Sequence, residues 1–198
     1  LHSIVSLSAT KFLNQQTSMD VLAELERTLS RDYPDNKYVQ DFSSLMNDLR
    51  KLPPGSVAPE ITLTSPEGKE IALSSLRGKV VLVDFWASWC GPCRRENPNI
   101  VALYKKYKDK GFEIYGVSLD ENVESWKEAI RKDGITWPQV SELKKWDSEV
   151  VKAYYVEAIP YSVLLDREGK IIAKGLRSEE LDLKLMELLG KKIGRAHV

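Results

Sequence analysis

The spacing of apolar residues changes near residue 52. Before that point, apolar side chains recur every three or four positions in two stripes: Met19, Leu22, Leu25 and Leu29, then Tyr38, Phe42, Leu45 and Leu49. This spacing is typical of amphipathic helices and predicts a helical pair within residues 17–50. Two prolines and a glycine at positions 53–55 then interrupt the pattern. We therefore predict a helical N-terminal segment over residues 1–52 and a separate domain over residues 53–198.

The second domain begins with runs that are typical of strands. Residues 61–64 and 70–73 alternate apolar and polar positions around a Ser-Pro-Glu-Gly turn, which predicts a β-hairpin. Residues 79–86 (KVVLVDFW) are almost continuously apolar. A run of this kind is expected for a central strand that is covered on both faces of its sheet.

Helices and strands are predicted to alternate through the rest of the domain. The expected elements are helices over about 92–110, 122–132 and 148–154, strands over 112–118, 162–165 and 170–173, and a final helix from 178. Asn122 and Ser178 are predicted as helix caps, because their side chains can accept hydrogen bonds from first-turn amides. This order predicts an α/β fold with a mixed central sheet, helices on its faces and an extra hairpin at its N-terminal end.

Composition and charge exclude several classes of function. The 198 residues contain 29 Lys or Arg and 29 Asp or Glu, so a net charge of zero gives no general attraction to nucleic acid or to an anionic membrane. The two histidines, His2 and His197, lie at opposite ends of the chain, which disfavours a catalytic triad or a multi-histidine metal site. Two cysteines are too few for a four-thiolate zinc site. We expect no nucleic-acid partner, no metal and no cofactor.

Candidate chemistry is concentrated in one motif, Cys90-Gly91-Pro92-Cys93, which follows the apolar strand and opens a helix. Two intervening residues across the first turn of a helix bring both sulfurs within bonding distance, so the pair can cycle between dithiol and disulfide. Cys90 would lie where unpaired amides and the positive end of the helix stabilise a thiolate. Cys93, one turn deeper, is expected to be shielded and to react second. The motif therefore predicts redox chemistry.

Three other interpretations of the motif are weaker. A structural disulfide across so short a loop gains little stability, because closing a short loop removes little entropy from the unfolded chain. A zinc site would need two further ligands, which no other cysteine and no internal histidine can supply. Haem attachment would need a histidine at position 94, where Arg94 stands.

Residues 83–93 (VDFWASWCGPC) are similar to the active-site strand and helix of thioredoxin. From about residue 55 to 189, some two thirds of the chain, the sequence resembles the TlpA/ResA-type thiol-disulfide oxidoreductases of the AhpC/TSA-related group. Segments that fit the group are the hairpin, 94–98 (RRENP), and 159–160 followed by 164–170. Residues 137–138, 146–147 and 172–177 resemble the version common in Bacteroidetes envelope proteins. The resemblance implies a thioredoxin-like fold.

The resemblance also implies residues that bind substrate. Ile159-Pro160 aligns with a cis-proline that faces the disulfide and orients the substrate backbone. Trp89 resembles an aromatic residue of the docking surface, and Gly91 and Pro92 are expected to contact substrate beside it.

Two acidic residues are implied as participants in proton transfer. Asp84 matches the buried acid beneath the thioredoxin disulfide, where burial raises the pKa of a carboxyl group and lets it exchange a proton with a shielded thiol. The lysine that pairs with this acid in thioredoxins is replaced by Gly116. Glu96 matches a ResA-type active-site glutamate, which Arg94 and Arg95 are expected to keep ionised. Alternatively, Asp84 is a structural acid satisfied by the backbone, and Glu96 only favours the helix dipole.

The implied activity is thiol-disulfide exchange, with reduction of envelope-protein disulfides as the expected direction. Cys90 would attack a substrate disulfide and Cys93 would resolve the mixed disulfide. The expected partners are disulfide-containing proteins and an upstream dithiol reductase, with a membrane-bound reductase as one candidate; the chain itself is expected to be a monomer. We expect a periplasmic or envelope location, with an anchor upstream of Leu1 as one arrangement and the helical segment as the end of a longer upstream domain.

Two alternative activities and one alternative role remain to be weighed. A peroxiredoxin-like peroxidase needs a threonine three residues before the reactive cysteine, where this chain has Ala87. A copper-handling protein of the Sco type needs a longer cysteine spacing and a distant histidine ligand. The N-terminal helices are either a recruitment module or a packing appendage, and the sequence does not separate the two.

Overall fold

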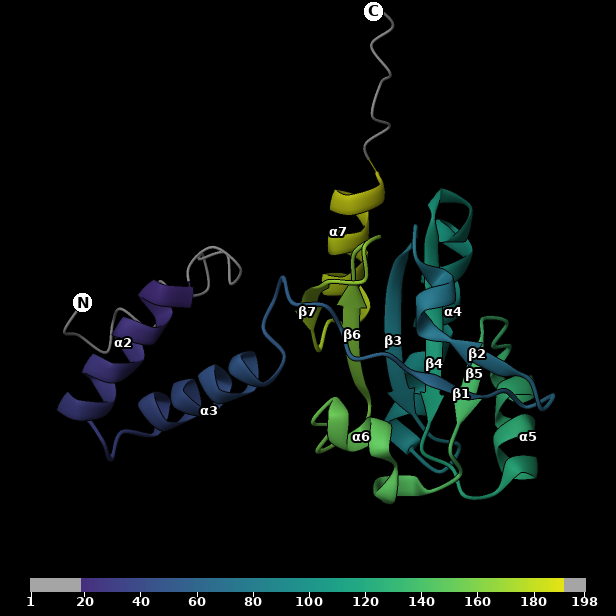
Figure 1. The fold of residues 1–198 in the computed structure, drawn as a ribbon, viewed down its shortest axis with the longest axis horizontal. Helices are drawn as coiled ribbons and strands as arrows, with labels where there is room; N and C mark the ends of the chain where they lie inside the picture. The colour runs from purple at the N-terminus through teal and green to yellow at the C-terminus, as the bar shows by residue number, and fades with distance from the viewer. Residues whose placement is uncertain (1–18, 191–198) are drawn as a thin grey trace, which may run out of the picture. The chain divides into compact units, whose positions relative to one another are not determined.

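The structure is a computed structural model that describes residues 19–190, and its chain separates into two units, Leu1–Ser56 and Val57–Val198. In the first unit, helices α2 (Met19–Asp32) and α3 (Lys37–Lys51) form the predicted helical pair (Figure 1). Asn36 caps α3 by accepting a hydrogen bond from the Tyr38 amide at 3.0 Å. The two helices share one apolar cluster: Leu22, Leu25, Leu29, Val39, Phe42 and Met46.

The predicted apolar stripe of α3 was wrong in its phase. Tyr38 and Leu45 are 71% and 47% exposed, whereas Val39 and Met46 are buried against α2. Both stripes have helical spacing and share Phe42, so periodicity alone does not distinguish them. Packing against α2 selects the stripe that is buried. The side chain of Leu49, the last member of the predicted stripe, lies outside those that the structure describes.

The second unit is built on a mixed seven-stranded sheet in the order β2-β1-β5-β4-β3-β6-β7 (Figure 1). Its strands are β1 (Thr62–Thr64), β2 (Glu70–Ala72), β3 (Val80–Trp86), β4 (Phe112–Ser118), β5 (Gln139–Ser141), β6 (Tyr161–Leu165) and β7 (Ile171–Lys174). The three central strands β3, β4 and β5 are parallel, and every other pairing is antiparallel. The predicted hairpin is present as β1 and β2, and it joins the sheet through β5.

Within residues 57–190, four α-helices accompany the sheet: α4 (Gly91–Tyr107), α5 (Val123–Asp133), α6 (Glu149–Ala153) and α7 (Ser178–Leu189). Short 3-10 turns lie at Leu73–Leu76, Lys108–Lys110 and Lys145–Asp147. Helix α4 contacts both α5 and α7. On the other face of β3, Phe85 packs against Tyr154 at the end of α6, with ring centroids 5.3 Å apart. Because consecutive residues of a strand point to opposite faces, Asp84 points toward α4.

Most local predictions for this unit agree with the structure, and two do not. Asn122 caps α5 by accepting from the Ser125 amide at 2.8 Å, as predicted. Ser178 is not a cap: Arg177 occupies the N-cap position of α7, and the Ser178 hydroxyl instead binds Glu96. Strand β5 was not predicted, because three residues after Pro138 are too few to show a period of two.

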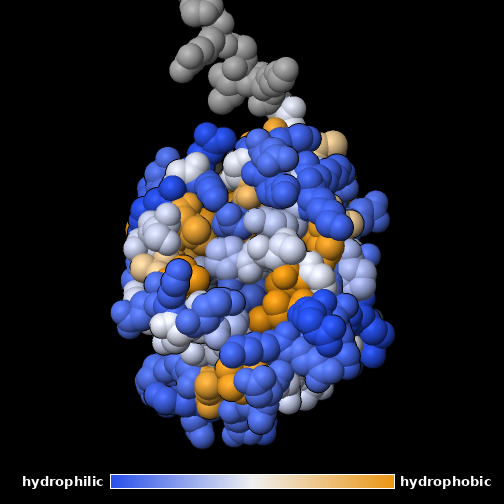
Figure 2. Space-filling view, turned by 90° about the vertical axis from the view of Figure 1, so that its right-hand side faces the viewer, coloured by the Kyte–Doolittle hydropathy of each residue, from blue (hydrophilic) through white to orange (hydrophobic). Residues whose placement is uncertain are grey.

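The surface of this unit is largely polar on the side shown in Figure 2, where hydrophobic side chains form only small separate groups. No helix among residues 19–190 combines the length and the apolar character needed to cross a bilayer.

Candidate active site

The disulfide between Cys90 and Cys93 lies at the start of α4, with Cα atoms 5.3 Å apart. Strand β3 is fully buried and delivers the chain to this point, and Cys90 is the N-cap of the helix. Its sulfur accepts a hydrogen bond from the Cys93 amide at 3.2 Å, which satisfies one of the unpaired first-turn donors. Cys90 is 4% exposed and Cys93 is 1% exposed. Pro92 lies in the first turn, where proline has no amide hydrogen bond to lose.

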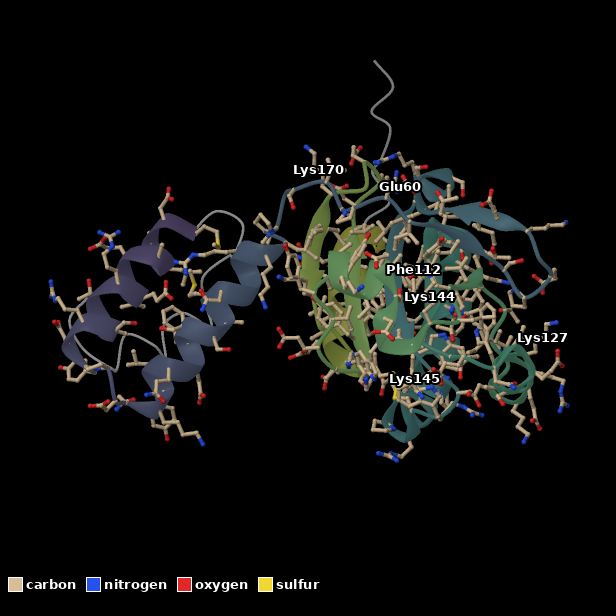
Figure 3. The ribbon with its side chains drawn as sticks, turned by 60° about the horizontal axis from the view of Figure 1, so that its bottom comes forward. Glu60, Phe112, Lys127, Lys144, Lys145 and Lys170 are labelled. Carbon is tan, nitrogen blue, oxygen red and sulfur yellow. A yellow bond between two sulfur atoms is a disulfide. The ribbon has the colours of Figure 1, made fainter. Side chains whose placement is uncertain are left out.

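An exposed aromatic pair lies beside the disulfide. Trp89 is 48% exposed, and its ring centroid is 6.5 Å from that of Trp146 in the 3-10 turn Lys145–Asp147. The Lys145 ammonium lies 5.9 Å from the centre of the Trp89 ring and is also paired with Glu121 at 2.7 Å. Lys145 is labelled in Figure 3. Sequence reasoning placed Trp89 near the site but gave Trp146 no role, because 56 residues separate them along the chain.

A buried acidic residue holds the loop that precedes Cys90. Asp120 is 1% exposed and accepts hydrogen bonds from the Ser88 amide at 2.9 Å and from the Ser118 hydroxyl at 2.7 Å. Arg94 donates to the Ser88 carbonyl oxygen at 3.1 Å. Sequence reasoning missed Asp120. A signal was present, since Asp120 follows the end of a strand parallel to β3, and the carboxyl ends of parallel strands meet at one edge of a sheet.

Beneath the disulfide lies a hollow that is too narrow for a water molecule. It is lined by Asp84, Trp86, Cys93, Glu96, Asn97, Pro160 and Arg177. The Ile159–Pro160 peptide bond is cis, as the resemblance implied. The structure thus brings together both expected acids, the second cysteine and the expected cis-proline. It also adds Arg177, which the sequence did not identify as a site residue.

Asp84 is 5% exposed, and its burial raises the pKa of the carboxyl from 3.8 to about 6. The positive charge of Arg177 lowers this pKa, and the negative charge of Glu96 raises it. A carboxyl with a pKa near 6 is mostly ionised at neutral pH but accepts a proton readily. A carboxyl group with a pKa in this range is suited to exchange protons with a thiol.

No side chain from the neighbouring strand contributes a charge at the position beside Asp84. Gly116 of β4 is paired in register with Asp84, and Gln139 of β5 is paired with Gly116. The Gln139 side chain covers this glycine so closely that a Cβ atom there would lie 2.0 Å from its Nε2 atom. Gln139 Oε1 accepts a hydrogen bond from the Trp86 indole at 2.8 Å. The side-chain amide of Gln139, bonded to the Trp86 indole, therefore occupies the space over Gly116.

Glu96 is half-buried, and its carboxylate is bound by α7. Oε1 accepts from the Ser178 amide at 3.2 Å and from the Ser178 hydroxyl at 2.8 Å. Oε2 accepts from the Asn99 side chain at 3.2 Å. Arg94 forms its salt bridge with Asp133 and not with Glu96. Residues two apart on a helix do not face each other, so Arg94 and Glu96 point in different directions.

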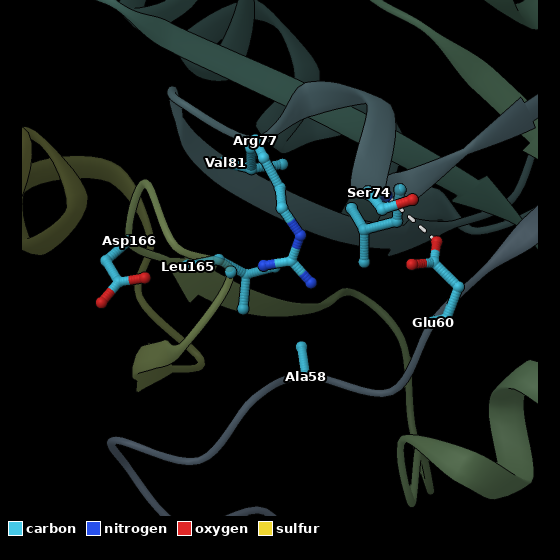
Figure 4. Close-up of a pocket in the computed structure, with 9 residues that line it drawn as sticks. Ala58, Glu60, Ser74, Arg77, Val81, Leu165 and Asp166 are labelled. Carbon is cyan, nitrogen blue, oxygen red and sulfur yellow. Dashed lines mark hydrogen bonds between the residues drawn. The ribbon is translucent and has the colours of Figure 1, made fainter.

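A second hollow lies near the start of β3, at the end remote from the cysteines (Figure 4). Glu60 accepts hydrogen bonds there from the amides of Ser74 at 3.0 Å and Ile61 at 3.2 Å. Arg77 donates to the Glu168 carbonyl oxygen. Glu60 and Arg77 thus form hydrogen bonds to the backbone of the protein itself. We therefore interpret this hollow as a structural junction between the hairpin region, β3 and the β6–β7 turn.

Comparison with known proteins assigns the family. Residues 54–174 match the model of the AhpC/TSA family. The chain belongs to the AhpC/TSA family. Within it, the chain is 36% identical over 141 residues to the thiol-disulfide oxidoreductase ResA of Bacillus thuringiensis subsp. konkukian, covering 71% of this chain and 79% of that protein. Identity to ResA of Bacillus subtilis is 34% over 137 residues, covering 68% and 75%.

Solved structures of similar proteins agree with this assignment. The thioredoxin domain of a thiol-disulfide oxidoreductase from Bacteroides vulgatus shares 43% identity with a TM-score of 0.66, covering 70% of this chain and 99% of that domain. A thiol:disulfide interchange protein from Bacteroides sp. shares 41% identity with a TM-score of 0.68, covering 74% and 97%. The predicted thioredoxin-like fold is confirmed. This AhpC/TSA-family chain is a thiol-disulfide oxidoreductase, and the peroxidase alternative is less well supported.

Proposed function

We propose that this AhpC/TSA-family enzyme reduces disulfide bonds of extracytoplasmic proteins through a dithiol–disulfide cycle of Cys90 and Cys93. The observation that carries the proposal is the position of the disulfide across the first turn of α4, directly after the buried strand β3. There the positive end of the helix stabilises the Cys90 thiolate. The pair can carry two electrons by itself, so the cycle needs no bound cofactor.

The proposed cycle has two exchange steps. The Cys90 thiolate attacks one sulfur of a substrate disulfide, whose other sulfur leaves as a thiolate and takes a proton. Cys93 then transfers its proton to Asp84 and attacks the Cys90 sulfur, which forms the enzyme disulfide and releases the second substrate thiolate. The substrate gains two electrons and the enzyme loses two.

The oxidised enzyme must then be reduced by a second dithiol protein before it can act again. The resemblance to TlpA/ResA-type envelope proteins supports an extracytoplasmic location for this exchange. We propose a periplasmic or envelope location and a membrane-bound dithiol reductase as the electron donor. We also propose that the enzyme acts as a monomer, which sedimentation equilibrium of the full chain tests.

A thiol balance with insulin tests the proposed activity. The reduced protein, freed of small thiols, should reduce insulin disulfides while losing two of its own thiols for each disulfide opened. The amounts of thiol lost and gained are measured by mass spectrometry after alkylation. Insulin that stays oxidised while the protein keeps both thiols would contradict the proposal.

Substrate is proposed to bind around Cys90 on the surface formed by Trp89 and Trp146, with Gly91 and Pro92 exposed beside it. Ile159 and the cis Pro160, which lines the hollow with Cys93, are proposed to complete this site. Exposed aromatic rings of this kind bury a large apolar area when a polypeptide docks.

Replacement of Trp146 by alanine should weaken substrate docking and leave the chemistry intact. Loss of one aromatic contact should raise KM for a protein substrate by about threefold to tenfold with little change in kcat. Tyr38→Ala is the matched control, because Tyr38 is an exposed aromatic residue of the N-terminal unit. An unchanged KM in Trp146→Ala would remove this residue from the docking surface.

We propose that residues 53–198 form a domain that folds without the N-terminal helices. Two contacts to the sheet lie directly after the boundary: Val57 pairs with Lys170, and the Ala58 amide donates to the Gly169 carbonyl oxygen at 3.0 Å. A chain that begins at Pro53 should therefore unfold cooperatively, within roughly 5 °C of the full chain in calorimetry. Loss of the cooperative transition would mean that the helices complete the core.

A further inference from the structure

Arg177 brings a positive charge to the narrow hollow beneath the disulfide, where Asp84 and Cys93 also lie. The residue is half-buried at the N-cap of α7. Its Nη2 atom is buried and has no hydrogen-bond partner within residues 19–190. A buried donor of a charged group is costly unless an opposite charge lies nearby. Asp84, which lines the same hollow and on which the charge of Arg177 acts, supplies such an opposite charge.

The charged and titratable groups around the hollow come from three elements. Strand β3 contributes Asp84, helix α4 contributes Cys93 and Glu96, and the start of α7 contributes Arg177. Arg177 favours the ionised form of Asp84, and Glu96 opposes it. Strand β4 adds no charge, because its paired residue is Gly116. Of the two described residues whose charges act on the Asp84 carboxyl, Arg177 is the cation and Glu96 the anion.

Two hydrogen bonds hold the chain segment that carries Arg177. The next residue, Ser178, donates from its amide and from its hydroxyl to one oxygen of Glu96. Glu96 lies three residues after Cys93 on α4, so the start of α7 is attached one helical turn from the second cysteine. Glu96 therefore also holds in place the segment that carries the arginine.

We propose that Arg177 is a positioning residue for disulfide exchange, whose charge keeps Asp84 in its carboxylate form at neutral pH. The inference rests on the proposed cycle of Cys90 and Cys93. When Cys93 attacks, its proton passes to an Asp84 oxygen, its sulfur bonds to the Cys90 sulfur, and the bond from Cys90 to the substrate sulfur breaks. Without Arg177, Asp84 would hold its own proton to a higher pH and could not accept the one from Cys93.

The reaction of the reduced enzyme with 5,5′-dithiobis(2-nitrobenzoate) separates the two steps. Attack by Cys90 releases the first nitrothiobenzoate anion, and attack by Cys93 on the mixed disulfide releases the second. Stopped-flow absorbance gives the rate of the second release across pH. In Arg177→Gln the half-maximal pH of this rate should rise by about one unit, as expected for loss of a nearby opposite charge. Arg177→Lys should recover most of the shift.

Matched variants distinguish this role from a structural one. Lys132→Gln removes one positive charge from an exposed ion pair with Glu128 and should leave the pH profile unchanged. Arg177→Met also removes the charge but keeps the apolar stem, and it should shift the pH profile as Arg177→Gln does. If one of these two variants folds poorly, the other still tests the inference. In an Asp84→Asn background, removal of Arg177 should cause no further shift.

Three results would overturn the inference: a profile of Arg177→Gln that overlays the wild type, a rate lowered equally at every pH, or the same shift in the Asp84→Asn background. Failure of the proposed function would look different. In that case the wild-type protein itself would release no second nitrothiobenzoate anion.

Discussion

Replacement of Cys90 by serine should lower disulfide reduction by roughly a thousandfold or more, because the variant lacks the sulfur that attacks substrate. A serine hydroxyl at the start of α4 is far less ionised than a thiol at neutral pH and cannot form a disulfide. The measurement is insulin reduction with excess dithiothreitol as electron donor, corrected for the uncatalysed rate. Full turnover by Cys90→Ser would contradict the proposed mechanism.

Replacement of Cys93 by serine should have a different effect from replacement of Cys90. The variants Cys90→Ser and Cys93→Ser therefore serve as controls for each other. Cys90 can still attack substrate, but no enzyme thiol can resolve the product. The variant should therefore accumulate a mixed disulfide and turn over only as fast as an external thiol releases it. Equal behaviour of the two variants would remove the distinction between attacking and resolving cysteines.

Replacement of Asp84 by asparagine should slow resolution of the mixed disulfide by about 100-fold at neutral pH, the contribution expected of a positioned general base. The pH profile of this step should also shift upward, since Cys93 must then lose its proton to solvent. Below about pH 6, where the wild-type carboxyl is protonated, the two rates should converge. Asp109→Asn, in the exposed turn after α4, is the control and should match the wild type. Unchanged rates in Asp84→Asn would make Asp84 a structural acid only.

The same substitution should stabilise the fold at neutral pH. Burial raises the pKa of Asp84 from 3.8 in the unfolded chain to about 6, so the folded protein binds this proton more tightly. The resulting stability is present below pH 4 and is lost as the pH rises through 6. Asparagine resembles the protonated acid, and Asp84→Asn should therefore raise the free energy of unfolding by up to about 3 kcal/mol at pH 7. The gain should vanish near pH 3 in denaturant titrations, and a loss of stability at pH 7 would contradict this account.

Features encoded within short stretches of sequence were predictable. The continuous apolar run of β3 identified the central strand, and the spacing of Cys90 and Cys93 identified the redox pair. In these cases the physical cause is local, because burial on both faces requires an apolar run and one helical turn brings the sulfurs together. The cap of α5 by Asn122 was predictable for the same reason.

Features that depend on packing between distant segments were not predictable from the pattern. Trp146 lies beside Trp89 only because the 3-10 turn Lys145–Asp147 comes to the disulfide in the folded chain. Arg177 lines the same hollow as Asp84, and Ser178, the next residue, attaches the start of α7 to α4. No periodicity in the sequence records such contacts.

The central claim is tested most directly by mapping the complex that the Cys93→Ser variant forms with a disulfide substrate. The reduced variant is mixed with oxidised insulin, quenched with acid and digested without reductant, and the cross-linked peptides are identified by mass spectrometry. The proposed cycle predicts one mixed disulfide that joins Cys90 to an insulin cysteine and disappears on addition of dithiothreitol. No covalent complex under conditions in which the wild-type protein reduces insulin would contradict it.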